Sequence, residues 1–367
     1  MEILYLASSV LCFFFLVILL GKKGKTLSDR ILLAWFVLLF SNVFSFYLIT
    51  RDSAPVILIA FLDSTPFIHG PVIWFYTAAL TGNIKSVSLR HLIHLIPFVI
   101  FFVFSSLMSF SGLKVREFVT IIFIALKFIL PGIYIIVSLV IIERHRRLIP
   151  NIFSTINRMD LKWLSSILYG GIALILFGAI TLLIDIFTGL KIPEYGGMYL
   201  NAAYSLCIML LGYYGFRQTS IFIPAGSRHE QFQIAEDKTK NKDRIPFSRK
   251  EDDGKGENDY NKLLQLMDME KPYTDPNLTL FMLAGYLGMT ENRLSFIINS
   301  RSGYNFFEFI NSYRVKMVIS RMKNREYISS TLLGLAFDSG FNSKASFNRA
   351  FRKFTGSTPS EYLHDLK

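Results

Sequence analysis

The first half of the chain is dominated by apolar stretches that are long enough to cross a lipid bilayer as helices. Each is near or above the roughly 20 residues that a helix needs to span a hydrocarbon core about 30 Å thick. Seven such stretches precede residue 217, at about 3–20, 31–50, 54–80, 92–110, 118–142, 163–188 and 195–216. This pattern predicts a seven-helix transmembrane bundle over residues 1–216.

The basic residues between these stretches predict how the bundle is oriented. If the N-terminus lies outside, the inner loops carry eleven Lys and Arg residues, and the outer loops carry four, which are Arg51, Lys114, Arg116 and Lys191. Cytoplasmic loops of membrane proteins carry an excess of these residues. We therefore expect the N-terminus outside and the chain from residue 217 onward in the cytoplasm.

A few ionisable residues interrupt the apolar stretches: Asp63, His69, Lys127 and Asp185. In this orientation Asp63 and Lys127 both lie about 13 Å deep at 1.5 Å per residue, so the sequence predicts that they pair. The two prolines and the glycine of DSTPFIHGP, residues 63–71, predict a kink or break that frees backbone carbonyls to line a cavity. Two interpretations stay open. These groups form an outward-facing ligand pocket, or they form a structural salt bridge that binds nothing.

The middle of the chain has the composition of a linker. Charges of both signs, Gly and Pro dominate residues 217–258, and apolar residues are sparse there. Such a segment buries too little apolar surface to offset the entropy lost on ordering, so we expect a flexible linker. The chain contains no H-E-x-x-H, G-x-S-x-G or P-loop motif, and Cys12 and Cys207 lack metal spacing. We therefore expect no catalytic site, metal or cofactor.

Helical periodicity returns after the linker and predicts an all-α domain over residues 259–367. Its last part, residues 277–367, carries 12 Lys and Arg against 6 Asp and Glu. An excess of positive charge favours an anionic partner such as nucleic acid.

Residues 278–303, LTLFMLAGYLGMTENRLSFIINSRSG, have the spacing of a helix-turn-helix. Thr279 is a predicted N-cap, Ala284 lies where the two helices touch, and Gly288 allows the sharp turn between them. The second helix of such a unit enters the major groove of DNA. Its exposed side is predicted to carry Asn292, Ser295, Phe296 and Asn299.

The pattern recurs in residues 328–356, with Ala336 and Gly340 at the same spacing and a basic helix after them. Arg349 is the predicted bidentate partner of a guanine edge. The same helix supplies Asn348 on its exposed side and three predicted phosphate contacts, Lys344, Arg352 and Lys353. A continuous helix over residues 305–324 is predicted to join the two units, so that they read successive grooves about 34 Å apart. The alternative is two ordinary helical pairs with solvated polar faces.

Residues 278–363 resemble the DNA-binding domain of AraC/XylS-type transcription regulators. The matching stretches are LAGYLGMTENRLS (283–295), FINSYRV (309–315), LGLAFDSGFNSKASFNRAFRKFTG (333–356) and TPSEYL (358–363). The resemblance implies about seven helices, two helix-turn-helix units, and contacts with double-stranded DNA from both second helices. Ala345 stands where members of the family often carry a polar, base-reading side chain. The whole chain resembles bacterial membrane-bound members with a seven-span N-terminal half.

These features predict a sequence-specific DNA-binding transcription regulator tethered to the bacterial inner (cytoplasmic) membrane. A signal at or outside the membrane would shift the bundle between two states. The sequence contains no known ligand motif that identifies this signal. The bundle would then change the orientation, dimerisation or release of the DNA-binding tail, and a homodimer would present four recognition helices. Two alternatives stay open: a transporter or membrane enzyme with an appended regulatory tail, and a bundle that only anchors the tail.

Overall fold

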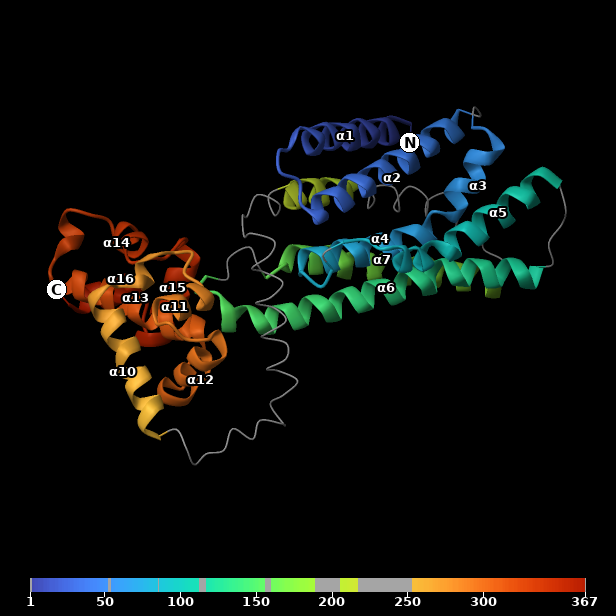
Figure 1. Cartoon of the computed structure of the whole chain (residues 1–367). Helices are drawn as coiled ribbons and strands as arrows, with labels where there is room; N and C mark the ends of the chain where they lie inside the picture. Colours follow the sequence, from blue (N-terminus) through green and yellow to red (C-terminus); the bar gives the residue numbers. More distant parts are fainter. Residues whose placement is uncertain are drawn as a thin grey trace. The chain divides into compact units, whose positions relative to one another are not determined.

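The structure is a computed structural model, in which residues 2–51, 54–84, 86–111, 117–155, 160–188, 205–216 and 253–366 are described. The elements assigned to these residues are all helices (Figure 1). The all-α fold class predicted from the sequence is therefore confirmed for the described residues. The chain divides into two compact units. The first unit comprises Met1–Glu143 and Leu161–Ala225, and the second comprises Arg144–Asp160 and Gly226–Lys367.

The first unit contains the long apolar helices. They are α1 (Glu2–Gly21), α2 (Leu27–Thr50), α3 (Val56–Ser64), α4 (Pro66–Leu80), the 3-10 helix η1 (Leu89–Leu95), α5 (Ile96–Ser111), α6 (Glu117–Ile152), α7 (Lys162–Thr188) and a shorter apolar helix, Ser205–Phe216. Helix α6 continues ten residues beyond the predicted end of its span at residue 142, and its last turns, from Arg144, belong to the second unit.

Among the described residues, five helical stretches are long and apolar enough to cross a membrane, or six if the bent pair α3–α4 counts as one span. The helix Ser205–Phe216 is shorter, and residues 195–204 of the predicted seventh span lie outside the described residues. Residues 217–252 of the predicted linker also lie outside them. Residues 253–258, which the sequence predicts as linker, instead begin a helix that extends from Asp253 to Met269.

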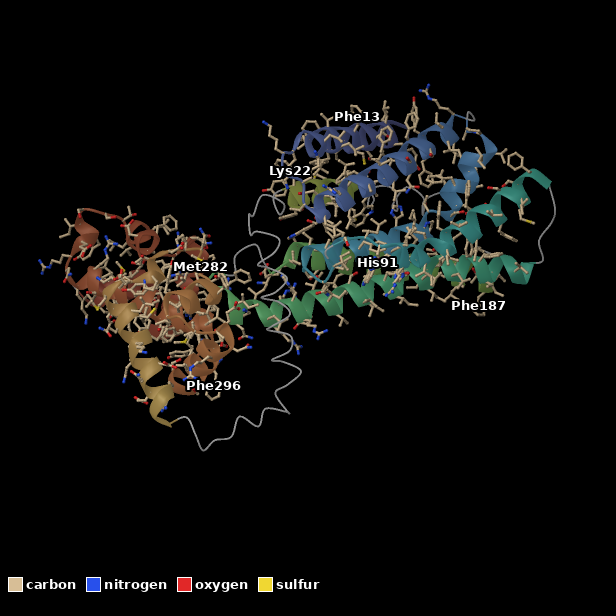
Figure 2. All side chains as sticks on the ribbon, in the orientation of Figure 1. Phe13, Lys22, His91, Phe187, Met282 and Phe296 are labelled. Carbon is tan, nitrogen blue, oxygen red and sulfur yellow. The ribbon has the colours of Figure 1, made fainter. Side chains whose placement is uncertain are left out.

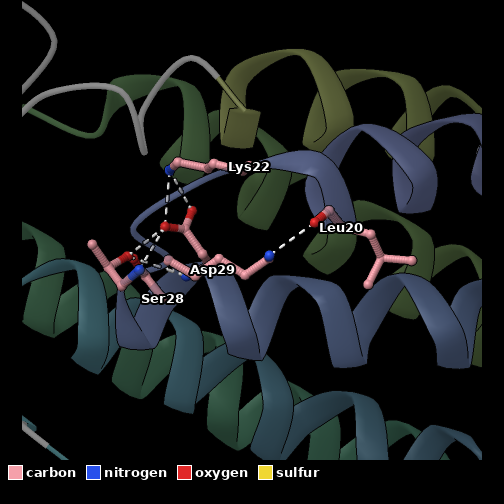
Figure 3. A network of polar contacts seen from close by, with 6 residues as sticks. Leu20, Lys22, Ser28 and Asp29 are labelled. Carbon is pink, nitrogen blue, oxygen red and sulfur yellow. Dashed lines mark hydrogen bonds and ion pairs between the residues drawn. The ribbon is translucent and has the colours of Figure 1, made fainter.

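A charged network closes the turn between α1 and α2 (Figure 3). Lys22 Nζ contacts both carboxylate oxygens of Asp29 at 2.8 Å, and Asp29 is 1% exposed. Thr26 is the N-cap of α2, and its hydroxyl accepts from the Asp29 N–H while the Asp29 carboxylate accepts from the Thr26 N–H. This capping box explains why α2 begins at Leu27. Lys22, one of the basic residues of a predicted inner loop, therefore has a structural partner.

The predicted break near residues 63–71 is present as a bend of 47° between α3 and α4. Pro66 begins the new helix. The expectation that freed carbonyls line a cavity here stays a prediction, and two carbonyls near the bend accept from local hydroxyls. The Ser64 hydroxyl donates to Ala60 O and the Thr65 hydroxyl to Leu62 O, both at 2.8 Å.

The core of the first unit joins helices that are distant in sequence. Ile208 and Leu211, from the helix Ser205–Phe216, are buried in the same cluster as residues of α1, α2 and α4. Glycine permits this close approach: a Cβ at Gly212 would lie 2.4 Å from the Phe15 ring, and one at Gly215 would lie 2.7 Å from Leu32. The Ser205–Phe216 helix is thus an integral part of this core.

The second unit contains shorter helices. They are α10 (Asp253–Met269), η2 (Pro272–Thr274), α11 (Leu280–Tyr286), α12 (Glu291–Ser302), α13 (Phe306–Lys323), η3 (Glu326–Ile328), α14 (Leu332–Asp338), α15 (Lys344–Thr355) and α16 (Pro359–Asp365). The predicted caps are confirmed in α11, α12 and α16, including the capping box of Thr358 and Glu361.

Two hydrophobic cores in this unit share helix α13. Phe306, Phe309 and Ile310, near its start, pack with buried residues of α10, α11 and α12. Val318 and Met322, near its end, pack with residues of α14 and α15. The first helical pair (α11 and α12) and the second helical pair (α14 and α15) are therefore held by opposite ends of one continuous helix.

Candidate nucleic-acid interface

The first helical pair has the local geometry that the sequence predicts. Thr279 caps α11 by accepting from the Met282 N–H at 3.2 Å, and Thr290 caps α12 by accepting from the Arg293 N–H at 3.3 Å. Gly288, between the helices, has φ +61°, which L side chains rarely adopt. Three local signals thus fix where α11 begins, where the chain turns and where α12 begins.

Helix α12 buries one side and exposes the other. Leu294, Ile297 and Ile298 are buried, as their spacing predicts. Asn292, Phe296 and Asn299 are exposed at positions i, i+4 and i+7, and Phe296, labelled in Figure 2, is 60% exposed. This is one face of a helix with a polar residue at each end and an aromatic ring between them.

Ser295 was predicted on this exposed face, and the structure buries it to 7% exposure. It lies beside Leu294 on the margin of the apolar side, and its carbonyl accepts from Asn299 Nδ2 at 2.8 Å. Part of the Asn299 amide is therefore engaged within the helix. The exposed face of α12 is narrower than the sequence suggests.

The second helical pair repeats this construction. Thr331 caps α14 and Ser343 caps α15, each by accepting from a backbone N–H three residues on, at 3.0 and 3.2 Å. Gly340 occupies the turn with φ +96°. Ala336 is buried where the two helices meet, and Phe347 and Phe351 fill the side of α15 that faces the core.

The outer side of α15 is basic. All its ionisable residues are Lys or Arg, and each is exposed: Lys344, Arg349, Arg352 and Lys353. Asn348 and Ala345 are exposed on the same helix. Lys353 also forms an ion pair with Glu308 of α13, a partner that the sequence did not suggest. Arg349 and Arg352 lie three residues apart, so both side chains leave the same face of the helix.

A buried arginine lies beneath both helical pairs. Arg314, on α13, is 1% exposed. Its Nε donates to Tyr273 O at 2.7 Å, Nη1 to Ser154 O at 3.0 Å, and Nη2 to Asp275 O at 2.8 Å. Burial lowers the pKa of Arg314 to about 10, and the nearby Asp275 charge acts in the opposite direction. The guanidinium therefore stays charged at neutral pH, and carbonyl oxygens supply the compensating polarity.

Neither Arg314 nor Ser154 is predicted from the sequence to have a structural or functional role. One local signal exists for Arg314: it lies four residues after Ile310 and four before Val318, both fully buried, so it falls on an apolar stripe of α13. A cation on such a stripe needs buried acceptors. Nothing in the sequence near Ser154 marks it as one of them.

In the first unit, Lys127 Nζ of α6 contacts Asp63 Oδ1 of α3, the two side chains for which the sequence predicts an interhelical pair. The Ser105 hydroxyl lies 3.4 Å from the other oxygen of Asp63. His69 has different partners: Trp35 Nε1 lies 3.3 Å from its Nδ1 and Asn42 Nδ2 lies 2.8 Å from its Nε2.

The predicted membrane site is therefore not assembled as one cluster by these contacts. His69 bridges α4 to α2, whereas Asp63 bridges α3 to α6 and α5. Asp185 lies within α7, and its side chain is outside the described part of the chain. Among the described residues, no group of three His, Cys, Asp or Glu side chains is placed to hold a metal ion.

Comparison with known proteins assigns the second unit to a class. The helix-turn-helix domain family matches residues 283–365, which include most of α11 and all of α12, α14 and α15. The chain therefore carries an AraC-type helix-turn-helix domain at its C-terminal end.

Part of the chain is homologous to HTH-type transcriptional regulators. It is 32% identical over 104 residues to uncharacterized HTH-type transcriptional regulators of Staphylococcus aureus strains COL, MSSA476 and N315. This match covers 28% of the chain, and the chain spans only 14% of the length of each relative. No solved structure shows significant similarity to the chain.

Proposed function

We propose that this protein is a sequence-specific DNA-binding transcription regulator held in the bacterial cytoplasmic membrane by a seven-span bundle. The basic outer face of α15, presented by a helix-turn-helix domain, carries the proposal. In the proposed domain order, residues 1–216 are the membrane bundle, 217–258 the linker and 259–367 the DNA-binding domain. The N-terminus lies outside and the DNA-binding domain in the cytoplasm.

Each helical pair is, in this proposal, a helix-turn-helix unit whose second helix enters the major groove. Arg349 has the chemistry to bond bidentately to a guanine edge. Lys344, Arg352 and Lys353 suit phosphates, and the residues of α12 that remain exposed, Asn292, Phe296 and Asn299, suit base edges and thymine methyl groups. Because α13 is one continuous helix through both cores, the two second helices are held at a fixed separation.

We propose that the bundle holds the protein in the membrane and responds to a signal at or outside the membrane. A signal shifts the protein between two states only to the extent that it binds them with different affinity. The Asp63–Lys127 ion pair between α3 and α6 is the candidate element for such a shift. Dimerisation of the tail would place four recognition helices on one operator and raise the effective affinity through linkage.

Genome-wide DNA crosslinking of the intact protein in its own host tests the proposal. We expect discrete promoter peaks that disappear in an Arg349→Ala variant, since a lost bidentate contact costs about 1–3 kcal/mol of discrimination. Lys262→Ala is the matched control, because it removes one exposed positive charge from α10 of the same unit. We expect the promoter peaks of the Lys262→Ala variant to persist. The absence of enrichment, or equal enrichment in all three proteins, would contradict the proposal and favour a transporter with an appended tail.

A further inference from the structure

Residues Phe153–Thr155, directly after helix α6, are bonded into the second unit. The N–H and the hydroxyl of Ser154 both donate to Leu278 O, at 3.3 and 2.7 Å. The Ser154 carbonyl accepts from Arg314 Nη1 at 3.0 Å and from Asn311 Nδ2 at 3.2 Å. The Ser154 hydroxyl also accepts from Arg314 Nη2 at 3.1 Å. Each polar group of this 1% exposed residue therefore has a partner in the second unit.

The two neighbours of Ser154 extend the contact along the start of the first helical pair. The Thr155 hydroxyl donates to Pro276 O at 2.8 Å. Phe153 forms an isolated antiparallel bridge with Thr279, the N-cap residue of α11. Carbonyls of residues 276 and 278 therefore accept bonds from this segment just before α11 begins.

The guanidinium of Arg314 connects this contact to the second helical pair. A Cβ at Gly340, in the turn between α14 and α15, would lie 2.2 Å from Tyr273 O and 2.8 Å from Arg314 Nε. The Gly340 backbone therefore rests against the same hydrogen bond that Arg314 makes to Tyr273. Interiors packed this closely transmit displacements, so Arg314 and the turn before α15 move together.

We propose that Phe153–Thr155 is a docking segment that holds the DNA-binding unit in its DNA-competent arrangement by completing the hydrogen bonds of Arg314. The loop after α6 is then a regulatory contact, additional to the covalent connection through residues 217–252. The inference rests on the proposed function for its effect on DNA, and the contact itself lies within the second unit.

The docked and undocked forms of the segment differ in the hydrogen bonds of one buried charge, the Arg314 guanidinium. When the segment leaves, Arg314 Nη1 loses Ser154 O and Nη2 loses Ser154 Oγ. A buried cation deprived of acceptors has to reorient or admit water. Such a rearrangement reaches the first helical pair through Leu278 and Thr279 and the second through Gly340. DNA bound to both pairs would favour the docked form to the same degree, because coupling between two sites is reciprocal.

Hydrogen exchange of the full-length protein in lipid nanodiscs tests the docking. Ser154→Ala with Thr155→Ala removes both hydroxyls of the segment. The matched control is Ser166→Ala with Thr188→Ala, whose hydroxyls donate to carbonyls within helix α7. We expect amides of residues 273–282 to exchange about tenfold faster in the first variant, with those of α1 and α2 unchanged in both. Equal exchange of residues 273–282 in the two variants would overturn the docking.

Promoter occupancy of the same variants tests the regulatory role. We expect it to fall about tenfold in Ser154→Ala with Thr155→Ala, and to stay at the wild-type level in the control. Faster exchange with unchanged occupancy would overturn the regulatory role. If the promoter peaks of the wild-type protein are absent or are unchanged in the Arg349→Ala variant, the proposed function fails. The exchange experiment still decides whether the segment docks.

Discussion

At the scale of single residues, the apolar half of the chain is most unusual at Asp63 and Lys127. In the proposed membrane bundle, an unpaired charged side chain at the centre of a helix would cost about 2.5–3.5 kcal/mol on insertion scales. Pairing offsets part of that cost, and Ser105 adds a hydroxyl to the carboxylate. The pair therefore joins α3, α5 and α6, and a change in the position of any of these helices alters its geometry.

Neutralising both charges distinguishes a sensor from an anchor. We expect Asp63→Asn with Lys127→Gln to keep the protein folded, because no charge is left unpaired, and to abolish condition-dependent changes in promoter occupancy. The charge-swapped variant, Asp63→Lys with Lys127→Asp, retains an ion pair and should retain regulation. Crosslinking across growth conditions that alter wild-type occupancy provides the measurement. Regulation that survives in the neutral variant would show that the pair is only structural.

Several individual residues show how far side-chain roles can be predicted from the sequence. The apolar sides of α12 and α15 were predictable, since Leu294, Ile298 and Phe351 follow the helical period. The exposed faces of these two helices were less predictable. Ser295 lies on the margin of an apolar stripe, where a helical wheel cannot decide burial, and the partner of Lys353 is Glu308, 45 residues away. Contacts of that kind depend on tertiary packing, which no local pattern encodes.

At the scale of elements, the glycines of the second unit perform different tasks. Gly285 lies within α11 with open space around it, Gly288 has a left-handed φ with open space, and Gly340 has a left-handed φ and no space. Alanine at these three positions therefore tests helix propensity, left-handed backbone strain and steric overlap one at a time within one domain.

Alanine at each of these glycines should give a graded series of stabilities. Gly285→Ala is expected to raise the free energy of unfolding by up to about 1 kcal/mol, because Ala favours helix over Gly. Gly288→Ala should lower it by roughly 1–2 kcal/mol through left-handed strain. Gly340→Ala should lower it by about 2–5 kcal/mol, since overpacking adds to that strain.

Local free energies from hydrogen exchange of α11, α12 and α15, in the full-length protein, measure this series. Gly285→Ala is the control for the other two variants, because it adds a methyl group where there is open space. A Gly340→Ala protein no less stable than Gly288→Ala would show that Arg314 and the turn before α15 are not packed as described.

The helices of the second unit were predictable because each carries its own start and stop signals. Thr279, Thr290 and Thr358 are caps that act within one turn of the chain. The continuation of α6 to Ile152 was not predicted, because the apolar pattern that defines a span ends near residue 142 while helix formers continue beyond it. The bonds of Ser154 could not be predicted from any local pattern, since their partners Leu278, Asn311 and Arg314 lie 124, 157 and 160 residues further along the chain.

At the scale of the whole molecule, the proposed orientation can be tested with topology reporters. We expect alkaline phosphatase to be active when fused after residue 52 or 113, and a green fluorescent protein to fluoresce when fused after residue 24 or at the C-terminus. The physical reason is the excess of Lys and Arg in the inner loops. The opposite pattern at these sites would contradict an outside N-terminus, and with it the cytoplasmic position of the DNA-binding unit.

The contact between Ser154 and Arg314 also sets an order of events during synthesis. The two residues are 160 positions apart, and chains grow at about 5–20 residues per second, so roughly 8–32 s separate the appearance of the segment from that of its binding site. Helices α10–α16 can pack from nearby contacts as they emerge, whereas the docking bonds close a long loop and form late. Every new molecule therefore passes through a stage in which Phe153–Thr155 has been made and its binding site has not.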